Sequence, residues 1–186
     1  MERQLLFNRF KEEVEKNTQF ALKHFSNLGD AQFNWHAEPD VWSIGQCIQH
    51  INMISRHWHK QFSKVLKGGI KSANKGEYTP GFLGKYVLKV ITPVVTKKFK
   101  TPNLFQPHFL VNGKVAMDEF LDFQKRFTDL AEKLRNYDLE KNKLNSTIYP
   151  VVHLKLGDAF EINNNHTARH LNQAFNVMNA PGFPKE

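Results

Sequence analysis

"LGDAFEINNNHTARHLNQAFNVMN", residues 156–179, is the stretch that decides the fold of this 186-residue chain. Apolar residues recur in it at intervals of three and four, the spacing of one face of an α-helix. They are Ala159, Ile162, Ala174 and Val177. The same stripe, continued at that interval, passes through His166 and His170. The segment therefore predicts a helix whose two histidines, one turn apart, both point toward the protein interior.

Three more amphipathic segments of about 20 residues precede this helix, and no segment alternates convincingly with a period of two. We expect helices over about residues 3–26, 43–69 and 115–135. Ser43 and Gln46 have the spacing of a capping box at the start of the second helix, and Asp158 and Glu161 have it at the start of the fourth. The sequence therefore predicts an all-α chain.

The second and third predicted helices are separated by more than 40 residues, about 68–112. A connection of this length can cross a bundle from end to end, so these two helices need not be antiparallel neighbours. We expect residues 82–90 to form a short extra helix, and Leu104 and Phe105 to anchor the crossover to the body. The fold prediction is a four-helix bundle with a long crossover between helices 2 and 3, in a single domain over residues 1–186.

The formal net charge of +8 has a local origin, because residues 60–100 contain ten lysines, no arginine and one acidic residue. A protein that reads nucleic acid usually presents arginines and stacking aromatics, whereas lysine is a flexible point charge. We therefore expect a solvated connection and no nucleic-acid partner, with binding of an anionic ligand or surface as the alternative.

Features of secreted and membrane proteins are missing from the sequence. The first 16 residues lack the apolar core of a secretory signal, and no apolar run is long enough to span a bilayer. The single cysteine, Cys47, cannot form an internal disulfide. We expect a cytoplasmic protein with no membrane partner.

A third histidine joins the pair on the last helix. His50 falls on the apolar stripe of the second helix, between Cys47 and Ile51. A buried polar group without a partner costs about 1 to 3 kcal/mol, and one divalent ion can satisfy three imidazoles together. Zinc and nickel both accept neutral imidazole nitrogen. Spacing alone leaves open the alternative that these are core histidines bonded to Asn or Gln.

The chain resembles the DinB-like superfamily over residues 1–180. The resemblance rests on the combination of "WSIGQCIQHI" (42–51), "KTPNLFQP" (100–107) and "LGDAFEINNNHTARHLNQ" (156–173). It implies a four-helix bundle with a long crossover, a bacterial source, a homodimer, and one divalent transition metal, zinc or nickel. By this resemblance the metal ligands are His50, His166 and His170.

Further residues near the predicted ligands are candidates for supporting roles. Gln173 lies one turn past His170, and Asn163 and Arg169 lie on the same helix. We expect these three to orient the ligands or to contact substrate, since ligating histidines usually need an outer partner. Cys47 could be a fourth ligand or a nucleophile, although a lone cysteine on an apolar stripe usually just packs.

Several kinds of chemistry are possible at such a metal centre. No carboxylate stands between His166 and His170, so the pattern of metallopeptidases is absent and no catalytic residue can be assigned. We favour transfer of a low-molecular-weight thiol to an electrophilic small-molecule substrate, because a coordinated thiolate needs no protein base. The alternatives are hydrolysis by metal-bound water, and a non-catalytic bundle that binds a metal or ligand.

Overall fold

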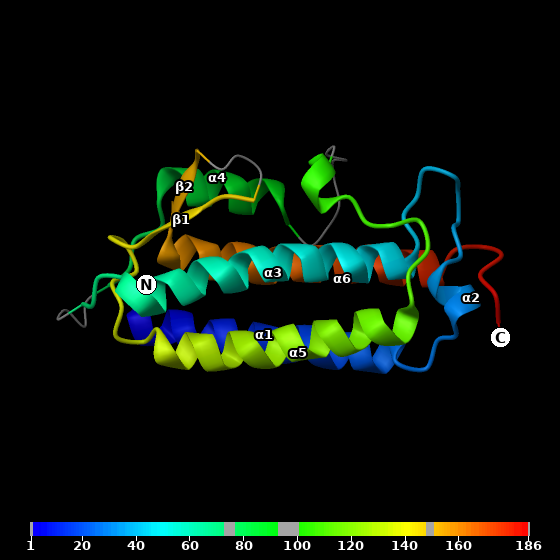
Figure 1. The fold of residues 1–186 in the computed structure, drawn as a ribbon, viewed down its shortest axis with the longest axis horizontal. Helices are drawn as coiled ribbons and strands as arrows, with labels where there is room; N and C mark the ends of the chain where they lie inside the picture. Colours follow the sequence, from blue (N-terminus) through cyan, green and yellow to red (C-terminus); the bar gives the residue numbers. More distant parts are fainter. Residues whose placement is uncertain (1, 73–76, 93–100, 148–150, 186) are drawn as a thin grey trace.

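Four long helices form a bundle in the computed structural model, which describes residues 2–72, 77–92, 101–147 and 151–185. In chain order the elements are α1 (Arg3–Phe25), α2 (Asp30–Phe33), α3 (Ile44–Gly68), α4 (Phe82–Val90), the 3-10 helix η1 (Asn103–Phe105), α5 (Gly113–Lys133), β1 (Lys143–Asn145), β2 (His153–Lys155) and α6 (Leu156–Met178). Helices α3 and α6 form one layer, and α1 and α5 form the other (Figure 1). The predicted all-α bundle is confirmed, and so is the short helix at 82–90.

None of the helices within the described ranges combines the length and the apolar character needed to cross a membrane.

Helices α3 and α5 lie side by side and run in the same direction. The Asn52 side chain donates to the carbonyl of Ala116 at 2.8 Å, and further along both helices the ring of Phe62 meets that of Phe127 at 6.1 Å. Two consecutive long helices can be parallel only if the chain returns along the full bundle between them. The long crossover connects them in this way, and its described elements α4 and η1 lie over the outer face of the α3–α6 layer (Figure 1).

Helix α6 runs antiparallel to α3 and parallel to α1. Phe160, near the start of α6, stacks on Phe62 at 4.7 Å and meets Phe10 at 4.6 Å. Near the other end of α6, the ring of Phe175 lies 5.5 Å from that of Phe20. This arrangement places the middle of α6 beside the first half of α3.

The two helix starts predicted from capping boxes have different outcomes. At α3 the box is present, because the Gln46 amide donates to the Ser43 hydroxyl at 3.2 Å and the Ser43 amide donates to the Gln46 side chain at 3.0 Å. At α6 the prediction is wrong. Strand β2 leads directly into the helix at Leu156, and the Asp158 carboxylate in the first turn accepts the amide of Lys155 at 3.3 Å.

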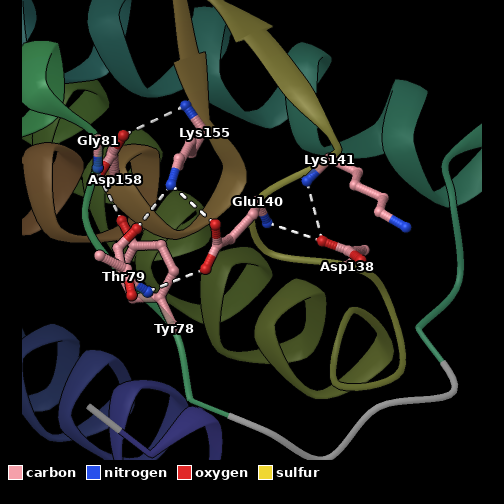
Figure 2. Close-up of polar contacts among 8 residues, drawn as sticks. All are labelled: Tyr78, Thr79, Gly81, Asp138, Glu140, Lys141, Lys155 and Asp158. Carbon is pink, nitrogen blue, oxygen red and sulfur yellow. Dashed lines mark hydrogen bonds and ion pairs between the residues drawn. The ribbon is translucent and has the colours of Figure 1, made fainter.

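The same Asp158 fixes the start of the crossover to α6. Its carboxylate accepts the hydroxyl of Tyr78 and, at 3.0 Å, the amide of Gly81 (Figure 2). The Lys155 ammonium donates to the Thr79 carbonyl at 2.7 Å and pairs with Glu140 at 2.9 Å. Helix α4, which begins directly after this anchor, is thereby held against α6.

Two shorter features of the crossover and its surroundings differ from expectation. Leu104 is 76% exposed, whereas Phe105 is 6% exposed, so of these two residues Phe105 alone packs into the bundle. Strands β1 and β2, which the sequence did not predict, pair antiparallel with Leu144 opposite Leu154. Both leucines are buried and belong to the apolar core.

The buried apolar side chains form two clusters rather than one. Along each long helix the division falls near the middle: between Val14 and Ala21, between Ile51 and Ile54, between Phe120 and Phe123, and between Ile162 and Leu171. Buried polar residues, among them Asn17, Ser55 and Asn163, lie at or beside this division. A polar layer therefore crosses the middle of the bundle.

Replacing Gly84 by alanine should destabilise the protein by about 1 to 3 kcal/mol. A Cβ atom at this position would overlap the carboxyl group of Asp158, which is buried and held by Tyr78 and Gly81. Urea denaturation measures the loss. The matched control is Gly68→Ala, since a Cβ at Gly68 meets nothing within 4 Å. Equal stability of the two variants would mean that α4 does not pack on α6 as described.

Candidate metal centre

Three histidine rings meet between α3 and α6. The centroid of the His50 ring lies 5.1 Å from that of His166 and 4.5 Å from that of His170, and the rings of His166 and His170 are 4.5 Å apart. One ring nitrogen from each lies within 4.8 Å of the other two. Among the described residues, this is the group of histidine, cysteine and carboxylate side chains that could hold a metal ion. His50 is buried and His166 is half-buried.

Two of the rings are oriented by hydrogen bonds on their outer side. The Nδ1 atom of His50 lies 2.8 Å from the carbonyl oxygen of Phe105, and Nδ1 of His170 lies 3.0 Å from the Gln173 side-chain oxygen. Because both partners are acceptors, each Nδ1 carries the proton and donates. The lone pair of both imidazoles is therefore on Nε2, the nitrogen that remains for a ligand.

The spacing of the inner nitrogens fits a metal ion. The Nε2 atoms of His50 and His166 are 3.3 Å apart. Two nitrogens that each lie about 2.0 to 2.1 Å from a tetrahedral ion are about 3.3 to 3.4 Å from one another. Three neutral nitrogen donors suit zinc or nickel, and they leave at least one coordination position for another ligand.

The environment keeps the three rings neutral at physiological pH. Burial, opposed by the bond to Phe105, lowers the pKa of His50 to about 4. Burial and the neighbouring His50 lower the pKa of His170 to about 3. For His166, burial is again the largest cause, and the charges of His170, His50 and Arg169 lower its pKa further. Protons therefore compete weakly with a metal ion for these nitrogens.

Trp42 covers one side of the histidine cluster. Its ring lies 5.0 Å from that of His50 and stacks on that of His170 at 5.8 Å with an interplanar angle of 28°. Trp42 is the first residue of the stretch 42–51 quoted above, but the sequence gave no sign that its ring contacts the histidines. Together with the Phe105 carbonyl, Trp42 is the part of the site that sequence reasoning missed.

The three residues expected to support the ligands occupy different places. Gln173 bonds to His170, as given above. Arg169 is buried and donates to the carbonyl of Thr92 at 3.0 Å, so it links α6 to the end of α4. Asn163 is buried one turn before His166, and its backbone carbonyl accepts the hydroxyl of Thr167. That any of these residues contacts substrate stays a prediction.

The cysteine and two further histidines of α3 lie outside the cluster. Cys47 is fully buried in the apolar core, and burial raises the pKa of its thiol, so it packs as a small hydrophobic residue. His57 bonds to the carbonyl of Asn145 at 2.9 Å, and the ring of His59 lies 6.1 Å from that of Phe123. Neither histidine belongs to the group that could hold an ion.

The fold and the site together define a class: an all-α bundle with a three-histidine cluster that fits a metal ion. The model of the DinB superfamily matches residues 13–174. Because this match covers most of the chain, the protein belongs to the DinB superfamily. Comparisons with curated proteins and with solved structures give no match.

Removing any one of the three histidines should abolish stoichiometric metal binding. His50→Ala, His166→Ala and His170→Ala each leave two imidazoles, which hold a divalent ion poorly. Elemental analysis after loading with zinc or nickel and desalting measures the bound metal. The control is His59→Ala, on the same helix as His50 but outside the cluster. Retention of one equivalent of metal by all three variants would exclude this site.

The metal-free protein should lose stability as the pH falls from 7 to 5. The unfolded chain takes up protons near the ordinary histidine pKa of 6.5, whereas the folded chain, with its lowered pKa values, does not. Each such histidine contributes a slope of about 1.4 kcal/mol per pH unit below 6.5. Urea denaturation at several pH values measures the slope, which should be smaller in His166→Gln. A stability independent of pH over this range would contradict the described burial of the rings.

Proposed function

We propose that this protein is a metal-dependent enzyme that transfers a low-molecular-weight thiol to an electrophilic small molecule. The observation that carries the proposal is the donor set: three imidazoles, neutral at physiological pH, converge on one point, and within the described residues no carboxylate joins them. A divalent ion held by neutral ligands lowers the pKa of a thiol and holds it as the nucleophilic thiolate.

Charge around the cluster favours an anionic ligand. Arg169 is buried beside the two histidines of α6, and its charge contributes to the lowered pKa of both. With neutral ligands and a nearby guanidinium, the positive potential at the site is not offset by the protein's own ligands. A thiolate, which brings a negative charge, meets this potential better than a neutral molecule does.

The residues around the cluster would orient the reaction without taking part in proton transfer. Phe105 and Gln173 fix two of the rings through their Nδ1 atoms. Trp42 offers an apolar wall against His50 and His170, suited to the carbon skeleton of a substrate. Hydrolysis, in contrast, benefits from a general base within hydrogen-bond reach of the attacking water, and the residues between His166 and His170 supply none.

The test combines the zinc- or nickel-loaded protein with a panel of thiols, including cysteine and glutathione, and 1-chloro-2,4-dinitrobenzene. In transfer, the sulfur–carbon bond forms, the carbon–chlorine bond breaks, chloride leaves and the thiol proton passes to solvent. Absorbance of the thioether product measures the rate. We expect a rate above the uncatalysed one for at least one thiol, lost on chelation and in His170→Ala.

Three results would contradict the proposal. The first is consumption of the electrophile without loss of thiol, which would indicate hydrolysis. The second is stoichiometric metal binding without turnover of any thiol in the panel, which would indicate a non-catalytic metal-binding bundle. The third is equal turnover by the protein and its His170→Ala variant. His59→Ala should behave as the unchanged protein in every assay.

A further inference from the structure

Buried polar atoms without partners gather in the polar layer that divides the core. Among the described residues, six buried side-chain polar atoms without a hydrogen-bond partner lie on α3, α5 and α6 near the middle of the bundle. They are Asn52 Oδ1, Ser55 Oγ, Trp58 Nε1, Gln124 Nε2, Asn163 Oδ1 and His166 Nδ1. Folded proteins rarely leave such atoms unsatisfied, so this concentration requires an explanation.

His166 differs from the other two histidines in its outer nitrogen. Its Nε2 faces Nε2 of His50 at 3.3 Å, so a metal ion between them requires the lone pair of His166 on Nε2 and its proton on Nδ1. The Nδ1 atoms of His50 and His170 have acceptors, whereas Nδ1 of His166 is buried without one. In the metal-bound arrangement, the Nδ1–H of His166 therefore needs an acceptor that the protein does not provide directly.

Asn163 lies close enough in the helix to provide an acceptor for His166 through a bridging molecule. Residues three apart on a helix are neighbours on one face, so the side chains of Asn163 and His166 lie beside each other. Asn163 is 2% exposed, and its Oδ1 is a buried acceptor without a donor. The two side chains make no direct hydrogen bond, so a donor and an acceptor lie one turn apart, each unsatisfied.

We propose that ordered water occupies the polar layer and bridges Nδ1 of His166 to Oδ1 of Asn163. With an ion bound, the water accepts from Nδ1–H of His166 and donates to the amide oxygen, satisfying both atoms with one molecule. Further donors and acceptors for its remaining bonds come from the layer, where Trp58 Nε1 donates and Ser55 Oγ does either. Without a metal, Nε2 of His50 accepts the Nε2–H of His166 at 3.3 Å, which leaves Nδ1 of His166 as an acceptor. The water then donates one hydrogen to Nδ1 of His166 and the other to Oδ1 of Asn163, so the hydration itself does not depend on a metal.

The bridge makes Asn163 a positioning residue for the metal centre, a consequence that rests on the proposed metal site. Through the water, Asn163 would hold the His166 ring in the tautomer and orientation that present Nε2 to the ion. Phe105 and Gln173 do this directly for the other two rings. Loss of such an outer partner typically lowers metal affinity by about 10- to 100-fold.

The first experiment is a high-resolution crystal structure of the metal-free protein and of Asn163→Leu. We expect a water between Asn163 Oδ1 and His166 Nδ1, and its loss in the variant. A dry contact, or a direct bond between the two side chains, would overturn the proposal. This measurement decides the hydration even if the protein binds no metal, so it separates failure of the bridge from failure of the proposed function.

The second experiment measures zinc affinity by competition with a chelator. Asn163→Leu should bind zinc about 10- to 100-fold more weakly, whereas Asn163→Asp, which keeps an acceptor, should bind at least as tightly as the unchanged protein. The control is Asn164→Leu, equally central but bonded through its side chain to the Phe10 carbonyl on α1. It should lose stability and keep its zinc affinity. Equal loss in all three variants, or no loss in Asn163→Leu, would refute the positioning role.

Discussion

The hydrogen bond from the His50 ring to the backbone carbonyl of Phe105 joins the two parts of this molecule, the bundle and the crossover. It fixes the tautomer of a buried imidazole, which in turn decides which nitrogen faces His166 and His170. Phe105 lies in η1, the part of the crossover that packs against α3, and from there its carbonyl reaches His50. The topology of the bundle is therefore part of the site.

Helix α6 carries contacts that serve the fold at one end and the site in the middle. In its first turn, Asp158 binds Tyr78 and Gly81 and so fixes where the crossover begins. About two and three turns later it presents His166 and His170 to α3. Arg169, between them, bonds to the carbonyl of Thr92 just past α4. One helix thus sets the position of the crossover and the position of two candidate ligands, which couples their geometry.

The polar layer lowers the stability of the bundle, and the candidate site gives a reason for its presence. A bundle of this size gains most stability from one continuous apolar core, and dividing the core with Asn, Ser and Gln side chains gives up part of that gain. Asn164 and Asn17 recover some of it by bonding to backbone carbonyls on the facing helix. The buried polar atoms of this layer that have no protein partner include Nδ1 of His166, which the proposed water would satisfy.

The sequence by itself determined the helices and the identity of the clustered histidines. Apolar spacing set the long helices to within about two residues at most ends, the box at Ser43 and Gln46 marked the start of α3, and the inward stripes selected His50, His166 and His170 from nine histidines. These features are local, because side-chain direction along a helix follows from spacing alone. The tertiary structure decided which of Leu104 and Phe105 is buried, how Asp158 is used, and that Trp42 and a backbone carbonyl meet the histidines. Such contacts depend on the path of the chain between helices, and every residue has a carbonyl, so no pattern of residue types records which one will reach a buried ring.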